Sequence, residues 1–201
     1  MSGSESPLNQ NEPIPAATER RMIRWDAVAA IIAALIGLLA LCVSGYTAYI
    51  QRQQVRAQVW PYLEAGNFDP QQTIEMLNKG VGPALVRSVQ VRVDGKSQRD
   101  WSSVLETLGL PSHGYQVSTL NGTVLSAGEQ KPWIMVKDHA VYERFKNVYK
   151  TRVGVEVCFC STLGDCWLYS DKHSVSDIGV QSLVNAVKQC PRLPLAEQFH
   201  G

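Results

Sequence analysis

The chain has 201 residues, which suffices for one domain and a membrane anchor but not for two domains with full cores. Its 19 basic and 18 acidic side chains leave a net charge of +1, so the composition gives no electrostatic reason to expect nucleic acid or a strongly acidic substrate as a partner. Hydrophobic residues make up 45% of the chain, and their uneven distribution is the first structural signal.

Residues 1–24 are predicted to form a disordered cytoplasmic tail that ends in a basic collar. The stretch 1–18 is rich in Ser, Pro, Asn, Gln and Glu, and its few apolar side chains cannot offset the entropy lost on ordering. Arg20, Arg21 and Arg24 follow, in a position where arginines meet anionic lipid head groups.

Residues Ala27–Ile50 contain no charged residue, no histidine and no side-chain amide. As a helix this stretch would be about 36 Å long, enough to cross about 30 Å of hydrocarbon. A helix of this length in a soluble core would carry a polar stripe, and this one carries none. Trp25 lies at one end and Tyr46 and Tyr49 near the other, where aromatic rings favour the membrane interface. We therefore predict a transmembrane helix at residues 25–50, with the lipid bilayer as its partner.

This span is predicted to be an uncleaved signal anchor. A cleaved signal peptide has a short leader and an apolar core of about 7–15 residues, whereas about 26 residues precede this longer run. Leu39-Ala40-Leu41-Cys42 is similar to a lipoprotein processing site, but Leu41 stands where such sites need a small residue. Cys42 is then expected to be a small apolar filler within the span.

Small side chains recur every three or four residues along the span. They are Ala30, Ala33, Gly37, Ala40, Ser44 and Ala48. Such a stripe lets helices approach closely in lipid, which predicts a homodimer or a docking face for another subunit. The alternative is that Ala and Gly are simply common in membrane spans.

Residues 51–58 continue without a helix breaker, which predicts a juxtamembrane helical extension that ends before Trp60-Pro61. Apolar and polar residues then alternate, most clearly in Val153–Phe159. Strands are expected at 85–93, 115–119, 123–126, 131–136, 153–159 and 166–170. Asp94-Gly95 marks a turn, and Asn121-Gly122 predicts a type I′ hairpin between the two strands that flank it.

Helices are expected at Ser97–Leu108 and after the N-cap Asp138, with a third candidate at Ser176–Lys188. The second of these carries apolar side chains along one face, namely Val141, Tyr142, Phe145, Val148 and Tyr149. The sequence thus predicts one β-rich domain at 59–190, β-sandwich-like or α+β with two or three short helices, followed by a C-terminal tail at 191–201.

Four cysteines outside the span, Cys158, Cys160, Cys166 and Cys190, predict two disulfides in an oxidising compartment. Cys158 and Cys160 share one face of their strand. A turn at 161–165 would bring Cys160 opposite Cys166 and leave Cys158 for Cys190. A zinc site is one alternative, although Cys-x-Cys departs from the usual ligand spacing. A redox pair is another, although the Cys-x-x-Cys motif is missing.

The arginines and the disulfides together predict the topology. Three arginines precede the span, whereas Arg52 and Arg56 follow it, and positive charge favours the cytoplasmic side. We therefore expect a single-pass protein of the bacterial inner membrane, with its N-terminus in the cytoplasm and its C-terminal domain in the periplasm.

Other patterns that carry chemistry elsewhere are weak in this chain. The amides of Asn78–Ala84 could in principle cradle an anion, but no helix begins there, so a tight turn or bulge is expected. His113, His139, His173 and His200 have no metal-binding or catalytic spacing. We therefore predict no catalytic residue, metal ligand, cofactor or small-molecule substrate.

Several short motifs follow the anchor in a fixed order. They are Trp60-Pro61-Tyr62-Leu63, Asn78-x-Gly80-x-Gly82-Pro83-Ala84, Asp94-Gly95, Cys158-Phe159-Cys160-Ser161 and Cys166-Trp167. Over roughly residues 25–170 the chain thereby resembles a loose group of small, uncharacterised bacterial proteins with a single membrane anchor. The resemblance implies the architecture and carries over no activity and no site residue.

The functional expectation is a non-enzymatic interaction module of the cell envelope, or an accessory subunit of a membrane complex. It would bind a protein partner or a second copy of itself. The alternative is a membrane-tethered metal- or thiol-dependent enzyme that uses Cys158, Cys160 and Cys166.

Overall fold

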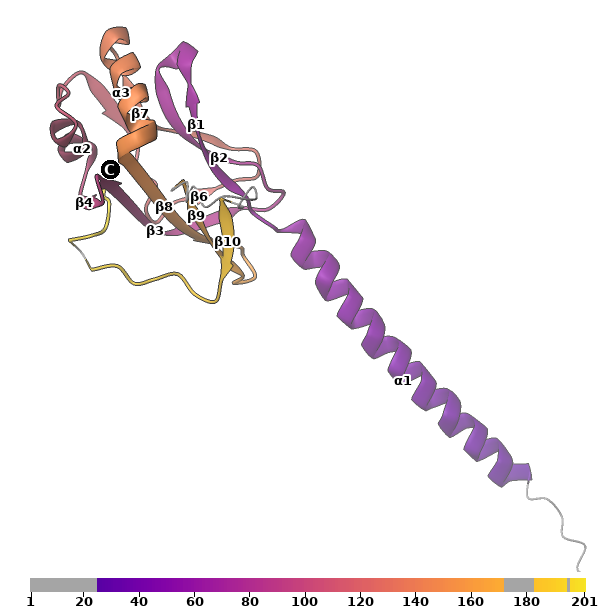
Figure 1. Ribbon diagram of the computed structural model, residues 1–201. Helices are drawn as coiled ribbons and strands as arrows, with labels where there is room; N and C mark the ends of the chain where they lie inside the picture. The colour runs from indigo at the N-terminus through magenta and orange to yellow at the C-terminus, as the bar shows by residue number, and fades with distance from the viewer. Residues whose placement is uncertain (1–24, 172–182, 195) are drawn as a thin grey trace, which may run out of the picture. The chain divides into compact units, whose positions relative to one another are not determined.

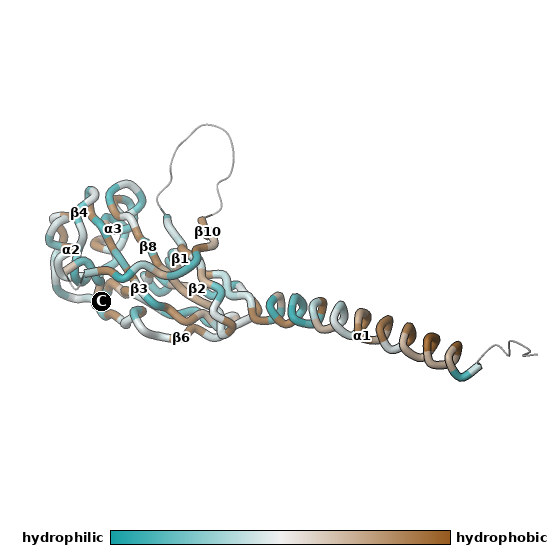
Figure 2. The backbone as a smooth tube through the Cα atoms, turned by 90° about the horizontal axis from the view of Figure 1, so that it is seen from below, coloured by the Kyte–Doolittle hydropathy of each residue, from teal (hydrophilic) through white to brown (hydrophobic). Residues whose placement is uncertain are grey.

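The computed structural model describes residues 25–171, 183–194 and 196–201, and the chain forms two compact units, residues 1–48 and 49–201. The unit that begins the chain contributes most of helix α1, Trp25–Gln58, in which no residue is buried. Among the described residues α1 is the one helix long and apolar enough to cross a membrane. Figure 2 shows apolar residues over most of α1 and hydrophilic ones toward Gln58. The predicted helical extension to residue 58 is confirmed.

The second unit is built from two antiparallel sheets (Figure 1). The first sheet has the order β1-β2-β7-β5, with bounds Leu63–Phe68, Thr73–Asn78, Gln130–Val136 and Tyr115–Val117. The second has the order β10-β9-β8-β3-β4, with bounds Val184–Val187, Cys166–Ser170, Val153–Cys160, Ala84–Val93 and Lys96–Gln98. The short strand β6, Val124–Leu125, also pairs with β3.

Strands β3 and β8 form the centre of the second sheet, as their alternating sequences predicted. Val89 pairs with Val157 and Val91 with Val155, and all four side chains are buried. The turn between β3 and β4 places both Asp94 and Gly95 at positive φ, as a type I′ turn requires. The long pairing of β3 with β8 forms the centre of the sheet that contains Cys158 and Cys160.

Two helices add to the sheets. Helix α2, Trp101–Thr107, begins after Asp100, whose side chain accepts a hydrogen bond from the Ser103 amide. Helix α3, His139–Arg152, begins after Asp138, which caps the Val141 amide as predicted. A short 3₁₀ helix, η1, spans Asp69–Gln71 between β1 and β2.

Aromatic rings join these elements in a single core. Trp101 of α2 packs edge-on against Trp133 of β7, with ring centroids 4.9 Å apart, and against Phe145 of α3 at 6.0 Å. Phe199 contacts both tryptophans and is 1% exposed. Phe199, which lies in the segment expected as a C-terminal tail at 191–201, thus contributes to the core, and its amide donates to the Val89 carbonyl. Such ring pairs add to the free energy gained by burying apolar area.

Three local predictions were wrong. Asn121-Gly122 does turn the chain, but β5 pairs with β7 and β6 pairs with β3, so the flanking strands lie in different sheets and form no hairpin. Only Gly122 of that dipeptide has a positive φ, whereas a type I′ turn needs both residues there. The helix expected at Ser97–Leu108 begins only at Trp101, because Ser97 and Gln98 belong to β4 and complete the hairpin with β3.

The third helix candidate, Ser176–Lys188, is also wrong where the structure describes it. Val184–Val187 forms β10, which pairs with β9, and the residues before 183 in that candidate lie outside the described residues. The hairpin of β1 and β2 was not predicted. Its strand Leu63–Phe68 reads Leu-Glu-Ala-Gly-Asn-Phe, which lacks β-branched residues and regular alternation, so its pairing with β2 decides its conformation.

Candidate functional site

The four cysteines of the second unit form two disulfides, Cys160–Cys166 and Cys158–Cys190. Strands β8 and β9 pair Cys160 directly with Cys166, and their Cα atoms lie 4.0 Å apart. Cys158 shares the face of Cys160, two residues earlier on β8, and bonds to Cys190 at a Cα separation of 5.6 Å. The pairing predicted from the strand and turn pattern is therefore confirmed. Cys42, in α1, is free and exposed.

The two disulfides are in contact with each other. The Sγ atom of Cys160 lies 3.8 Å from that of Cys190, although the two belong to different bridges. The Sγ atoms of Cys160, Cys166 and Cys190 all lie within 4.8 Å of one another. All three are engaged in disulfides, so they offer no thiolate to a metal ion, which is what zinc requires.

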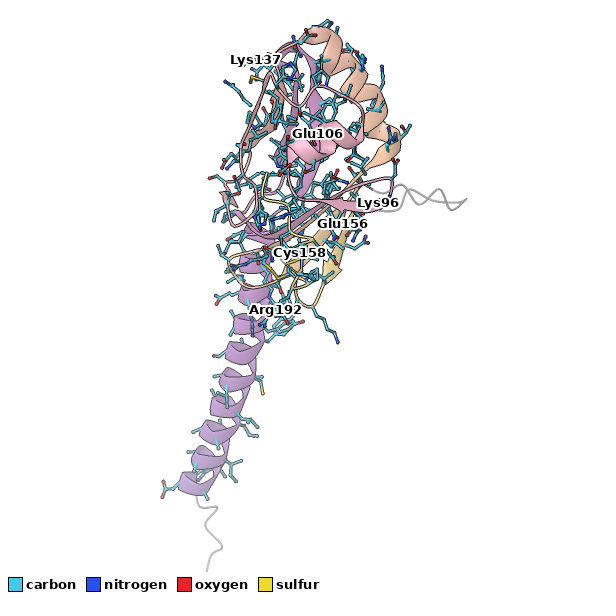
Figure 3. All side chains as sticks on the ribbon, turned by 90° about the vertical axis from the view of Figure 1, so that its left-hand side faces the viewer. Lys96, Glu106, Lys137, Glu156, Cys158 and Arg192 are labelled. Atoms are coloured by element: carbon cyan, nitrogen blue, oxygen red, sulfur yellow. A yellow bond between two sulfur atoms is a disulfide. The ribbon has the colours of Figure 1, made fainter. Side chains whose placement is uncertain are left out.

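A cleft of about 510 Å³ lies beside these sulfur atoms. It is lined by Arg87, Ser88, Cys160, Cys166, Gln189, Cys190, Pro191, Arg192, Leu193 and Gln198. Figure 3 shows Cys158 and Arg192 at the same end of the β-rich unit. The cleft is thus bounded on one side by β3, β8 and β9 and on the other by the segment that follows β10.

Arg87 owes its position to an irregularity in the central sheet. In the ladder between β3 and β8, Val86 pairs with Phe159 and Ser88 with Cys158, so Arg87 is the extra residue of a bulge. A bulge redirects a side chain relative to the regular alternation of its strand. Arg87 is exposed and lines the cleft instead of joining the buried side of β3.

Arg192 is positioned by the covalent attachment of its segment. The Cys158–Cys190 bridge holds the chain two residues before Arg192. The side-chain amide of Gln198 donates to the Leu193 carbonyl at 2.9 Å. Neither Arg87 nor Arg192 has an ion-pair partner among residues 25–171, 183–194 and 196–201. The cleft therefore presents two guanidinium groups that have no ion-pair partner in the part of the chain that the structure describes, and such groups suit a carboxylate.

The glycine-rich segment Asn78–Ala84 is a packing device and not an anion cradle. The amides of Val81 and Gly82 donate to the Trp60 carbonyl, and the Gly80 amide donates to the Asn78 side chain. A Cβ atom on Gly80 or Gly82 would overlap the backbone of the residues that lead from α1 into β1. The expected tight turn is thus confirmed, and its amides are already satisfied.

Asn78 is the centre of this packing device. Its side chain is fully buried, accepts from the Tyr62 amide and donates to the carbonyls of Gly82 and Leu125. One side chain thereby joins the start of β1, the glycine turn and β6. These contacts explain in structural terms why the chain carries both Trp60-Pro61 and the later motif Asn78-x-Gly80-x-Gly82-Pro83.

A second polar cluster joins η1 to α3. The Tyr142 hydroxyl donates to Asp69 at 2.8 Å, and the Lys146 ammonium reaches the same carboxylate at 3.0 Å. The hydrogen bond from Tyr142, followed by that from Lys146, lowers the pKa of Asp69. Burial, followed by the hydrogen bond to Asp69, raises the pKa of Tyr142. The cluster joins η1 to α3 and does not line the cleft, so we infer that it stabilises the fold.

The remaining predicted residues are not brought to the cleft. His113, His139 and His200 lie apart from it, and His173 is outside the described residues, as are Arg20, Arg21 and Arg24. Trp25, Tyr46 and Tyr49 are exposed on α1, as are the small residues Ala30, Ala33, Gly37, Ala40, Ser44 and Ala48. Their roles at the membrane interface and in helix packing stay predictions.

Sequence reasoning missed Arg87 and Arg192 as site residues. Arg87 follows the regular alternation of its strand in the sequence, and only the bulge opposite β8 distinguishes it. Comparison with protein-family models, curated proteins and solved structures finds no match. The cleft is therefore interpreted from its own chemistry.

Proposed function

We propose that this protein is a single-pass inner-membrane protein whose periplasmic domain binds an acidic segment of a protein partner in the cleft between Arg87 and Arg192. It acts as a non-enzymatic interaction module or as the accessory subunit of a membrane complex. Helix α1 keeps the domain at the membrane. The disulfides, which persist in an oxidising compartment, hold the wall of the cleft in place.

The observation that carries this proposal is the pair of arginines without ion-pair partners among the described residues, set in a cleft of about 510 Å³. A guanidinium group binds a carboxylate through two parallel hydrogen bonds, which adds directional specificity to charge attraction. Ser88 and Gln189 line the same cleft and supply neutral hydrogen-bonding groups. A segment that contains Asp or Glu offers hydrogen-bond acceptors both to the two guanidinium groups and to these neutral groups.

The proposed topology rests on two supports. The disulfides are expected on the oxidising side of the membrane, because thiols in the cytoplasm are kept reduced. The three arginines before the span exceed the two that follow it, which favours a cytoplasmic N-terminus. Counting blocked cysteines by acid-quenched alkylation of the protein in native membranes tests this, because four free thiols in the domain would place it in the cytoplasm.

Site-directed photo-crosslinking in native membranes tests the partner. A photo-crosslinking amino acid replaces Gln189 in the full chain, and a discrete crosslinked species is expected after irradiation. Arg87→Glu with Arg192→Glu should reduce that species about tenfold or more, because hydrogen bonds to charged groups are each worth about 1.5–3 kcal/mol.

The matched control is Arg144→Glu, since Arg144 is exposed on α3 and does not line the cleft. Arg144→Glu changes the net charge by half as much as the double variant does, and it places a glutamate on the domain surface away from the cleft. The crosslink should persist in this control. A crosslink that survives the double variant, or the same loss in the control, would show that the cleft is not the binding site.

A further inference from the structure

The two disulfides lie close enough to exchange with each other. Cys160 and Cys190 belong to different bridges, yet their sulfur atoms are 3.8 Å apart, near van der Waals contact. Thiol–disulfide exchange needs a thiolate sulfur to reach a disulfide sulfur. Reduction of either bridge would leave a sulfur of the Cys160···Cys190 pair already placed beside the other bridge.

We propose that the four cysteines form a single thiol–disulfide exchange site, which accepts two electrons from an external dithiol and then carries the bridge Cys160–Cys190. The native bridges are thus the oxidised state of this site. Its reductant is a dithiol, such as the active site of a thioredoxin-like oxidoreductase or, in the laboratory, dithiothreitol.

One route begins at Cys190, which is partly exposed. A thiolate of the dithiol attacks the Cys190 sulfur and forms a mixed disulfide, and Cys158 leaves as a thiolate. The second thiol of the reagent closes its own disulfide and releases Cys190. The Cys190 thiolate then attacks Cys160, the Cys160–Cys166 bond breaks, and Cys166 leaves as a thiolate.

The other route begins at Cys166, which is 9% exposed. Attack there forms a mixed disulfide with Cys166 and releases Cys160, whose thiolate attacks Cys190 and displaces Cys158. The second thiol of the reagent then closes the reagent's own disulfide and releases Cys166. Both routes end with the bridge Cys160–Cys190 and with thiols at Cys158 and Cys166. The dithiol is oxidised to its disulfide, and its two electrons and two protons appear as the two protein thiols.

The cleft supplies the environment that such chemistry needs. Cys160, Cys166 and Cys190 all line it, so a reductant has access to both bridges from one side. Arg87 and Arg192 line the same cleft, and nearby positive charge favours the thiolate form, which is the attacking species. Cys158 is 1% exposed and is reached only through its partner sulfur, which makes it a leaving group and not an entry point.

Exchange would also move the attachment of the segment that follows β10. Its anchor on β8 would shift from Cys158 to Cys160, which is about 7 Å along a strand. That segment forms one wall of the cleft, so the two redox states present Arg192 differently. Only this consequence for partner binding rests on the proposed function, because the exchange itself depends on the sulfur geometry alone.

Partial reduction of the full chain in detergent micelles tests the proposal. The protein carries Cys42→Ala so that the four domain cysteines alone are counted. One equivalent of dithiothreitol is added without oxygen, exchange is stopped with acid, and thiols are labelled with N-ethylmaleimide after denaturation. Mass spectrometry of the peptides should place the label on Cys158 and Cys166 in the species with one bridge. Label on Cys160 and Cys166, or on Cys158 and Cys190, would show two independent bridges and overturn the proposal.

Single variants provide a second measurement that needs no added reductant. Cys166→Ser leaves Cys160 as a thiol beside the Cys158–Cys190 bridge, and the label should be divided between Cys160 and Cys158. Cys190→Ser is the matched control, with one bridge and one thiol at Cys158. Cys158 is too far from both sulfurs of the remaining bridge. Cβ atoms two residues apart on a strand are about 7 Å apart, and Cys158 pairs with Leu168, so Cys166 is only its diagonal neighbour at about 7–8 Å. The label should therefore stay on Cys158. Label confined to Cys160 in the first variant would overturn the proposal.

Discussion

The disulfides should differ in how much they stabilise the domain, because they close loops of different length. Cys158–Cys190 joins residues 32 apart in the sequence, whereas Cys160–Cys166 joins residues 6 apart. In the chain-entropy description, a loop of 32 residues lowers the entropy of the unfolded chain enough to stabilise the fold by about 3.7 kcal/mol, and a loop of 6 by about 2.2 kcal/mol. The difference is about 1.5 kcal/mol.

The perturbation removes one bridge at a time, with Cys158→Ala and Cys190→Ala in one protein and Cys160→Ala and Cys166→Ala in the other. Urea unfolding of the full chain in micelles is followed by the fluorescence of the buried tryptophans of the core. With a slope of about 2 kcal/mol per molar urea, the midpoints should fall by about 1.9 M and about 1.1 M.

Cys42→Ala is the control for these measurements, because Cys42 lies in the first unit and forms no bridge. It should leave the unfolding midpoint of the domain unchanged. A larger loss for the protein without Cys160–Cys166 would refute the reasoning, since a short loop cannot restrict the unfolded chain more than a long one. Equal losses would indicate that native-state effects, and not chain entropy, dominate.

Three further changes test contacts that stabilise the β-rich unit away from the cleft. Gly82→Ala should lower the free energy of unfolding by about 1–3 kcal/mol, because the new Cβ atom would overlap the backbone between α1 and β1. Gly66→Ala is its control, because a Cβ atom there meets open space, and it should change the free energy of unfolding by less than about 0.5 kcal/mol. Thermal melts measure both changes. Asn78→Ala leaves buried backbone groups without their partner and should cost about 2–3 kcal/mol in urea unfolding. Asp69→Asn should destabilise the domain at neutral pH, because the lowered pKa of this carboxyl means that its charged form is preferred in the fold. This contribution is present above the ordinary carboxyl pKa and is lost as pH falls through the lower folded value, so melts of wild type and variant should converge in acid; a constant difference would contradict the assignment.

The elements that sequence reasoning found have strong local causes. Helix α1 follows from an uninterrupted apolar run, and its end at Gln58 follows from Trp60-Pro61. Strands β3 and β8 follow from the alternation of valines with polar residues. The Cys160–Cys166 bridge follows from a strand, a turn and a strand of fixed length, because the side-chain period of two leaves few ways to pair them.

Errors arose where distant pairing overrides a local signal. Asn121-Gly122 is a strong hairpin motif, yet β5 and β6 bond to different strands. Hydrogen bonds along β7 and β3 are available to those residues only after both sheets have assembled, and they decide against the local hairpin. The same cause explains β10, whose four residues take extended form because β9 offers them a free edge.

By itself the sequence determined the long apolar helix, the β-rich class and the Cys160–Cys166 pairing, since each depends on residues near in the chain or on a single unbroken pattern, and the Cys158–Cys190 pairing then followed because only these two cysteines of the domain were left. Only the tertiary structure decided the cleft, the outward position of Arg87 and the 3.8 Å contact between Cys160 and Cys190. These features depend on a bulge in one sheet and on the path of the segment after β10. Both depend on packing between parts of the chain that are far apart in the sequence, and no local sequence pattern predicts such packing.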